Sequence, residues 1–358
     1  MDQMEQRLKE LTECHGVPGH EGAVRELMKS YLEPLSEQIV TDRLGSVFGI
    51  KTGAEAGPKI MLAGHLDEIG FMVTQITSKG FLRFTQLGGW WPHNLLSHRV
   101  LVKTRKGDHI GLIGSKPPHV LTPNERSKVL QLKDLYIDIG AKNEEDAREM
   151  GVRPGDWIVP VSDFFTMRGG DLWAGKALDN RAGCSLAVEV LSRLQDGSHP
   201  NIVYAGATVQ EEVGLRGAGT AANLVQPDIA FALDVGIAYD TPGSESGSMT
   251  CNVGDGPLIL LMDSSMISHG GLRRLAVDTA EELGIKIQFD AMTGGGTDGG
   301  KFHTSGIGCP TLAIGFATRY IHSHNAVMSR SDFDKAAELL TALVRKLDRE
   351  TVDQLFRS

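Results

Sequence analysis

Apolar residues recur at both ends of the chain in patterns that predict helices alternating with strands. Over residues 24–32, apolar side chains fall at the spacing of one helix face, while continuous apolar runs such as 59–63 have strand length. This alternation is typical of an α/β fold with a mainly parallel sheet covered by helices on both faces. The predicted strands are 38–42, 46–51, 59–63, 202–209, 229–233, 257–262, 286–292 and 311–316, and the predicted helices are 3–14, 24–32, 180–195, 217–224, 269–283 and a long one from 331.

The middle of the chain has a different pattern. From about residue 69 to 163, short β-type runs follow one another with turn residues between them, and only 143–150 has helical character. The runs include IGFMVTQI, FLRFTQLG, RVLVKTRKGD and HIGLIGSK. We therefore expect a small β-domain, residues 68–164, inserted into one α/β domain that is formed by residues 1–67 and 165–358.

Composition narrows the class of protein. The net charge of the 358 residues is −9, and no basic patch is present that would bind nucleic acid. No apolar stretch is long enough to span a membrane, and the charged N-terminus lacks the apolar core of a signal peptide. Cys14, Cys184, Cys251 and Cys309 form no CxxC pair, which is typical of a reducing compartment. We expect a soluble cytoplasmic protein that binds neither nucleic acid nor membranes.

Polar residues follow directly after several predicted strands. In open α/β sheets, ligands bind at the carboxyl ends of the strands, so these residues are candidates for a functional site. At least two histidines and four carboxylates are expected at one edge of the sheet. The candidates are His65 and Asp67 after strand 59–63, Glu211 and Glu212 after 202–209, Asp234 after 229–233, His322 and His324 beyond 311–316, and Asp179 before the helix at 180.

Such a cluster of acids would repel itself if no cation compensated it. Two divalent ions would remove the repulsion, because they take imidazole and carboxylate ligands and leave a further carboxylate as general base. Each residue alone has an ordinary interpretation: a histidine at a strand end is commonly hydrogen-bonded and structural, and Leu-Asp-Asn before a helix is commonly an N-cap. The prediction of a dinuclear centre rests on the coincidence of all these positions.

Six motifs occur in order along the chain: GHLDEIG, KALDNRAG, TVQEEVGLRGA, ALDVG, GGGTDGG and RYIHS. Through them the sequence resembles the glutamyl and deblocking aminopeptidases, a family of dinuclear metallo-aminopeptidases that often form tetrahedral dodecamers. The resemblance extends over essentially the whole chain. It implies a zinc-peptidase-like α/β fold, a PDZ-like β-domain inserted at the predicted place, short peptides as substrates and self-assembly into a dodecamer. It also implies two divalent ions per subunit, Zn or Co, with Mn as a further option.

The same resemblance implies a ligand set. His65 and Asp234 would bind one ion, Glu212 and His322 would bind the other, and Asp179 would bridge both. The peptide bond that follows Asp179 would be cis.

The remaining motif residues receive other roles from the resemblance. Glu211 would be the general base, Asp67 would stand behind His65, and Thr297 and Asp298 would lie near the N-terminus of a bound substrate. Elementary geometry is consistent with the role of Asp67: residues two apart on extended backbone point the same way, so its carboxylate can accept a hydrogen bond from the ring nitrogen of His65 that does not bind metal.

Two other stretches have an alternative interpretation. The glycine-rich stretch 295–301 has P-loop spacing, but Phe302 stands where a P-loop has Ser or Thr, so we do not expect nucleotide binding. The aromatic stretch 88–96 is either part of the β-domain core or a subunit interface. Because every predicted ligand lies outside the β-domain, we expect that domain to serve assembly rather than chemistry.

The leading hypothesis is therefore a metal-dependent aminopeptidase that removes N-terminal residues from peptides. The alternatives are a dinuclear amidohydrolase acting on N-acyl amino acids and a non-catalytic assembly module. A free base at Glu211 argues against the second alternative, because a structural metal site needs none. The preferred N-terminal residue stays open, although Arg319 or Lys301 would favour an acidic side chain if either lined the substrate pocket.

Overall fold

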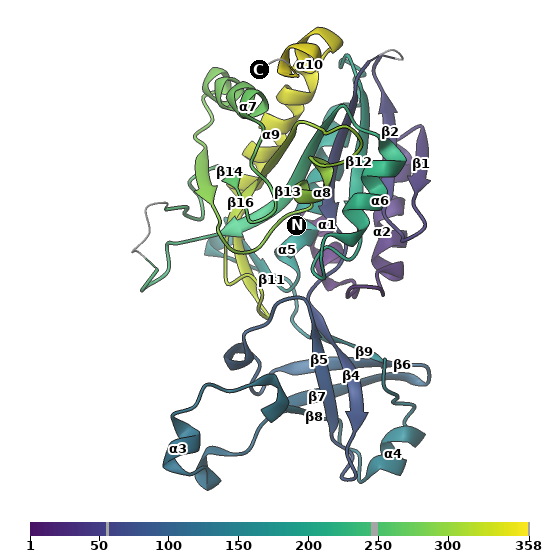
Figure 1. The fold of residues 1–358 in the computed structure, drawn as a ribbon, viewed down its shortest axis with the longest axis vertical. Helices are drawn as coiled ribbons and strands as arrows, with labels where there is room; N and C mark the ends of the chain where they lie inside the picture. The colour runs from purple at the N-terminus through teal and green to yellow at the C-terminus, as the bar shows by residue number, and fades with distance from the viewer. Residues whose placement is uncertain (55–56, 245–249, 357–358) are drawn as a thin grey trace.

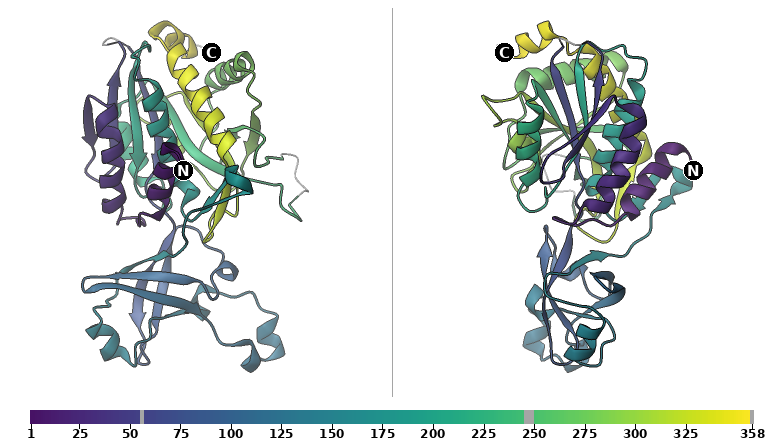
Figure 2. Two further views of the ribbon diagram at one scale, coloured as in Figure 1. Left: turned by 180° about the vertical axis from the view of Figure 1, so that it is seen from behind. Right: turned by 90° about the vertical axis from the view of Figure 1, so that its right-hand side faces the viewer.

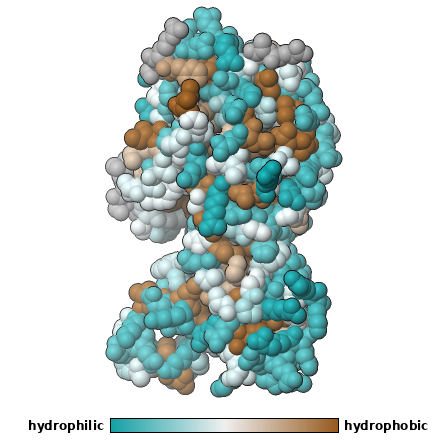
Figure 3. Space-filling view, turned by 45° about the vertical axis from the view of Figure 1, so that its right-hand side comes forward, coloured by the Kyte–Doolittle hydropathy of each residue, from teal (hydrophilic) through white to brown (hydrophobic). Residues whose placement is uncertain are grey.

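The computed structural model describes residues 1–54, 57–244 and 250–356. These residues form a helix-covered sheet and a smaller β-barrel (Figure 1). The two bodies meet at a narrow waist, which the space-filling view also shows (Figure 3). The chain leaves the sheet after residue 65 and returns to it at residue 165, so the barrel is inserted within the sheet body.

The larger body is built on a sheet that has 11 strands among the described residues. Its main path runs in the order β1-β2-β12-β3-β13-β16-β17-β11-β10, and β14 and β15 extend from β16. The strands are β1 (Gln38–Thr41), β2 (Val47–Thr52), β3 (Lys59–His65), β10 (Phe165–Met167), β11 (Leu172–Gly175), β12 (Ile202–Thr208), β13 (Ile229–Ile237), β14 (Pro257–Met262), β15 (Gln288–Ala291), β16 (Thr311–Arg319) and β17 (Ala326–Ser329).

The sheet is mixed, so the expectation of a mainly parallel sheet is wrong for its edges. Among the described strands, β12, β3, β13 and β16 pair in parallel at the centre, and β14 pairs in parallel with β15. Towards the edges the pairings are antiparallel. Short connections, such as those between β1 and β2 or between β16 and β17, can join only antiparallel neighbours, whereas parallel neighbours need a long crossover.

Helices cover both faces of this sheet, as the sequence predicts (Figure 2). The helices α1 (Gln3–Glu13), α2 (Gly22–Leu32), α5 (Leu178–Arg193), α7 (Gly270–Leu283) and α9 (Arg330–Lys346) share one core with the sheet. On the other face lie α6 (Arg216–Val225) and the short α8 (Gly299–Phe302). The chain ends in α10 (Arg349–Leu355). No helix in the described ranges is long and apolar enough to cross a membrane.

The inserted body is a closed barrel of β4, β5, β8, β7, β6 and β9, in that order. Its strands are β4 (Gly70–Ile76), β5 (Leu82–Leu87), β6 (Arg99–Thr104), β7 (Gly107–Gly114), β8 (Tyr136–Asp138) and β9 (Trp157–Pro160), with α3 (Pro123–Arg126) and α4 (Glu144–Glu149) at its surface. The barrel has its own apolar core, which is separate from that of the sheet. The predicted domain limits at 67/68 and 164/165 and the likeness to PDZ domains stay predictions.

Trp90 and Trp91 have different environments in the structure. Trp90 is 7% exposed and stacks on Phe71 inside the barrel core, whereas Trp91 is 60% exposed. Within the stretch 88–96, Trp90 therefore belongs to the barrel core, and Trp91 is available for a subunit interface. Only Trp91 offers an apolar ring that a second copy of the chain could cover.

Candidate metal centre

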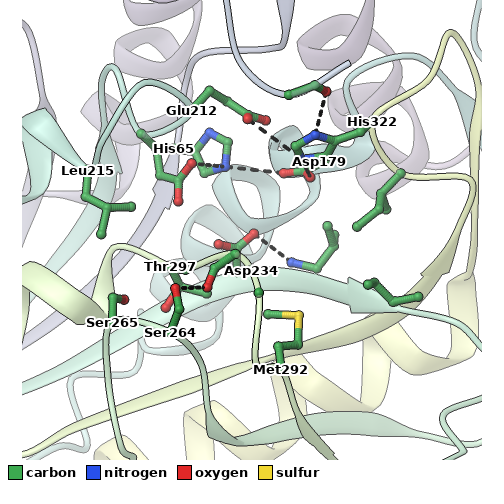
Figure 4. A pocket seen from close by; sticks show the side chains of 18 of the residues that line it. His65, Asp179, Glu212, Leu215, Asp234, Ser264, Ser265, Met292, Thr297 and His322 are labelled. Atoms are coloured by element: carbon green, nitrogen blue, oxygen red, sulfur yellow. Dashed lines mark hydrogen bonds and ion pairs between the residues drawn. The ribbon is translucent and has the colours of Figure 1, made fainter. Parts of the chain in front are cut away.

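The candidate residues converge on one cavity although they come from distant parts of the chain. His65 is the last residue of β3, Asp234 lies within β13, and Asp179 lies in the first turn of α5. Glu211 and Glu212 follow β12, and His322 follows β16. All six side chains line a cavity of about 640 Å³ (Figure 4).

Asp179 lies between the two histidines. Its Oδ1 is 3.3 Å from Nε2 of His65, and its Oδ2 is 3.5 Å from Nε2 of His322. The same Nε2 of His322 lies 3.7 Å from Oε2 of Glu212. Two groups of donor atoms therefore share Asp179, one with His65 and Asp234 and the other with Glu212 and His322, and within each group the atoms lie within 4.8 Å of one another.

The peptide bond between Asp179 and Asn180 is cis, as predicted. The side chain of Asn180 donates to the main-chain carbonyl of Leu233 at 2.7 Å and accepts from the N–H of Gly183 at 2.9 Å. These bonds hold the first turn of α5 against β13. Nothing in the sequence pattern singles out Asn180 for this role, since Asn before a helix is an ordinary N-cap residue.

Asp67 lies beside His65, but its carboxylate makes its hydrogen bonds to two main-chain groups. Its carboxylate accepts the main-chain N–H of Glu211 and that of Glu212, each at 3.0 Å. Nδ1 of His65 is closest to the main-chain carbonyl of Asp67, at 3.0 Å, while the carboxylate oxygen lies 3.6 Å away. The buried Asp67 carboxylate thus orients the segment that carries both glutamates, and its main chain orients the His65 ring.

Negative charge at the centre is poorly compensated by the protein itself. Burial raises the pKa of Glu211 and that of Asp234 well above the ordinary range, and neighbouring acids raise both further. Burial and the charge of Asp179 together raise the pKa of Glu212 to about 8. Burial lowers the pKa of His322, but the contact with Asp179, the negative charges of Glu212 and Asp179 and the hydrogen bond to Gly89 together raise it to about 10. Imidazole and carboxylate donors with an excess of negative charge fit divalent transition-metal ions.

Thr297 and Asp298 lie beside the cavity but face different partners. Thr297 lines the cavity, and both its main-chain N–H and its hydroxyl donate to Oδ2 of Asp263, at 3.0 and 2.9 Å. Asp298 is buried, and its Oδ2 accepts a hydrogen bond from the hydroxyl of Thr208. Its Oδ1 has no hydrogen-bond partner among the described residues. Ser264, Ser265 and Met292, which the sequence did not indicate, line the same side of the cavity as Thr297 (Figure 4).

Two residues near the motifs are excluded from the cluster of donors. His324 is buried between Trp90 and His98, with ring centroids 5.3 and 3.7 Å away, and belongs to none of the donor groups. Glu68, which follows Asp67 in the sequence, is buried against Nζ of Lys176 at 2.6 Å. Glu68 therefore stabilises the point where the chain leaves the sheet and takes no part in the cavity.

Comparisons with known proteins identify the family to which the chain belongs. The profile of the family described as M42 glutamyl aminopeptidase matches residues 45–339. The chain is 36% identical to the glutamyl aminopeptidase of Lactococcus lactis subsp. cremoris over 352 residues, which cover 98% of each chain.

Solved structures give the same result. The TET aminopeptidase of Thaumarchaeota archaeon SCGC AB-539-E09 is 44% identical with a TM-score of 0.96, over 99% of this chain and all of that one. The TET1 peptidase of Pyrococcus horikoshii, which can assemble into a tetrahedron or a large octahedral shell, is 34% identical with a TM-score of 0.85, over 96% of this chain and all of that one. The resemblance inferred from the motifs is confirmed: the chain is an aminopeptidase and belongs to the M42 glutamyl aminopeptidase family.

Proposed function

We propose that the enzyme hydrolyses the N-terminal residue from peptides at a dinuclear metal centre, with Glu211 as the general base. The observation that carries this proposal is the position of Asp179. Its two carboxylate oxygens face two different imidazoles, His65 at 3.3 Å and His322 at 3.5 Å. A carboxylate so placed is suited to bridge two ions. Without ions, the buried His65 and the half-buried His322 would both pair with this one carboxylate.

The proposed ligands divide into two sets around Asp179. His65 and Asp234 would hold one ion, and Glu212 and His322 would hold the other. This donor set suits Zn²⁺ or Co²⁺, with Mn²⁺ as a third option. When bound, the ions would polarise the scissile carbonyl and lower the pKa of a water at the centre towards about 7.

Glu211 is the carboxylate available for proton transfer. It lies 3.8 Å from Nε2 of His65, lines the cavity and is fixed through its main-chain N–H by Asp67. As general base it would accept a proton from the attacking water and deliver it to the amine of the leaving peptide. The adjacent Glu212 lies 3.7 Å from Nε2 of His322, which supports assigning it to metal binding and Glu211 to proton transfer. Donor atoms of both glutamates also lie within 4.8 Å of His65.

We also propose a role for the inserted barrel in assembly. It would correspond to the PDZ-like insert of the family, residues 68–164, and would help copies of the chain to form a dodecamer. A similar TET1 peptidase that assembles into a tetrahedron supports this proposal, as does the exposed ring of Trp91. The catalytic domain would then comprise residues 1–67 and 165–358.

A panel of aminoacyl-anilides tests the proposed chemistry. Each substrate is assayed with the purified enzyme, after removal of metal by a chelator, and after addition of Zn²⁺, Co²⁺ or Mn²⁺. We expect chelation to abolish activity and one of the ions to restore it. N-acetylated anilides serve as the control and should be inert, because an aminopeptidase requires a free α-amine. Activity that survives complete metal removal, or equal activity on the acetylated substrates, would overturn the proposal.

A further inference from the structure

Two consecutive glycines of the inserted barrel approach the metal centre. Gly88 and Gly89 follow β5, which ends at Leu87. A Cβ atom added to Gly88 would lie 2.4 Å from Cγ2 of Ile69 and 3.1 Å from Oε2 of Glu212, and one added to Gly89 would lie 3.0 Å from Nδ1 of His322. The backbone of the barrel thus lies directly against two of the proposed ligands, and both belong to the same donor group.

Gly89 also makes a hydrogen bond with one of those ligands. Its carbonyl oxygen lies 2.7 Å from Nδ1 of His322. A carbonyl only accepts, so Nδ1 of the neutral ring carries the proton and Nε2 keeps its lone pair. Nε2 is the atom that faces Asp179 and Glu212, at 3.5 and 3.7 Å. Such a partner fixes the tautomer and the ring orientation that metal binding requires.

The turn is held firmly on the side away from the cavity. The next residue, Trp90, stacks on Phe71 of β4 with ring centroids 4.9 Å apart, and its other neighbour is His324 at 5.3 Å. Trp90 is therefore anchored both in the barrel core and against the segment that carries His322. This anchoring places the carbonyl of Gly89 beside His322, which is itself half-buried and held at a φ of 56° in a loop.

We propose that the turn formed by Gly88 and Gly89 is a wall of the metal subsite formed by Asp179, Glu212 and His322, and that Gly89 is a positioning residue for His322. The inference rests on the proposed function, because it assumes that this donor group binds an ion. It changes the expected role of the barrel, which contributes to the metal centre as well as to assembly. Neither His65 nor Asp234 is among the nearest neighbours that a Cβ at Gly88 or Gly89 would meet.

The test measures metal binding in matched pairs of glycine variants. Gly89→Ala places a methyl group against His322, whereas Gly219→Ala on α6 meets nothing within 4 Å. Gly88→Ala and Gly151→Ala both put alanine at a left-handed φ, 86° and 101°, and both crowd an aliphatic side-chain atom, in Ile69 at 2.4 Å and in Lys106 at 2.9 Å. Only Gly88→Ala also approaches Glu212. Bound metal per chain is measured by plasma spectrometry, the affinity of each ion by chelator competition, and folding by circular dichroism.

We expect Gly89→Ala and Gly88→Ala to weaken one of the two ions by about 10- to 100-fold, the range typical for loss of a partner that orients a metal ligand. The other ion should stay bound, and both controls should bind two ions as the wild type does. If the wild type itself binds fewer than two ions, the proposed function fails and this inference falls with it. If the wild type binds two and both test variants bind them with unchanged affinity, the inference alone is wrong. Should Gly89→Ala not fold, the pair at residues 88 and 151 decides the question with the same outcomes.

Discussion

The Oδ1 atom of Asp67 accepts a hydrogen bond from the main-chain N–H of Glu211 at 3.0 Å. The second oxygen of the same carboxylate accepts the N–H of Glu212 at the same distance. Two buried donors at the end of β12 are thereby satisfied by one side chain from the end of β3. The position of the proposed base therefore depends on Asp67 through the backbone, and this dependence can be tested.

Asp67→Asn should impair both stability and catalysis. Asparagine keeps one acceptor oxygen but presents an NH₂ group to the other buried N–H, which then lacks an acceptor. An unsatisfied buried donor costs about 1–3 kcal/mol. We expect a lower Tm in thermal unfolding and a reduced kcat. Asp171→Asn, at an exposed surface pair with Arg168, is the control. An Asp67→Asn variant with the Tm and kcat of the wild type would show that these hydrogen bonds matter little.

Changing Glu211 or Glu212 to glutamine should impair different properties of the enzyme, catalysis in the first case and metal binding in the second. Glu211→Gln keeps the size of the side chain but cannot accept a proton, so kcat should fall by about 10²–10⁴-fold, the usual contribution of a general base. Both metal ions should remain bound, with little change in KM. Glu212→Gln removes an anionic donor and should weaken or strip one ion.

Metal content by plasma spectrometry, measured beside kcat, separates these two outcomes. If Glu211→Gln loses an ion and Glu212→Gln keeps both, the two roles are reversed. Full activity of Glu211→Gln would rule out the proposed mechanism.

The cavity should prefer peptides with an uncharged N-terminal side chain. Its apolar lining includes Leu215, Ile237 and Met292, and no lysine or arginine is among the described lining residues. Arg319, which would have favoured acidic side chains, pairs instead with Asp240, with Nε 2.7 Å from Oδ1. An acidic substrate side chain would be buried without a partner, which is costly. We expect higher kcat/KM for leucyl- and methionyl-anilides than for the glutamyl compound; the reverse order would contradict this.

Trp91→Glu should weaken assembly without disturbing the metal centre. The ring is exposed in the single chain, so a charge there does not affect folding, but it would be buried unpaired at a subunit contact. Light scattering should report a lower mass for Trp91→Glu and the wild-type mass for Trp91→Phe, with metal content the same in both. A wild-type chain that is a monomer at micromolar concentration would refute the assembly hypothesis.

The sequence predicted best those site residues that lie at the ends of strands. His65 and Asp234 follow or end apolar runs, and the carboxyl ends of parallel strands meet at one edge, so their convergence could be predicted. The direction of the edge strands could not, because apolar runs look alike whichever way they pair. A short connection such as that between β1 and β2 was the available signal for antiparallel pairing.

The contacts made by main-chain atoms could not be predicted from the sequence. The partner of the Asp67 carboxylate is a pair of N–H groups, and the partner of His322 is the carbonyl of Gly89. Every residue carries such groups, so residue identity does not mark the ones that are used. The sequence contains the Gly-Gly pair at 88–89, but its approach to the proposed ligands depends on how the barrel packs against the sheet, which the sequence pattern does not indicate.

The proposed ligands span most of the chain, and this has a consequence for synthesis. A chain made from its N-terminus presents His65 early, but the group of Asp179, Glu212 and His322 is incomplete until residue 322 has been added. The central strand β13 also lacks its neighbour β16 until nearly the same point. If the proposed ligands bind the ions, a nascent or truncated chain would have no complete hydrolytic site, and the peptidase would become active only once nearly all of it has been made.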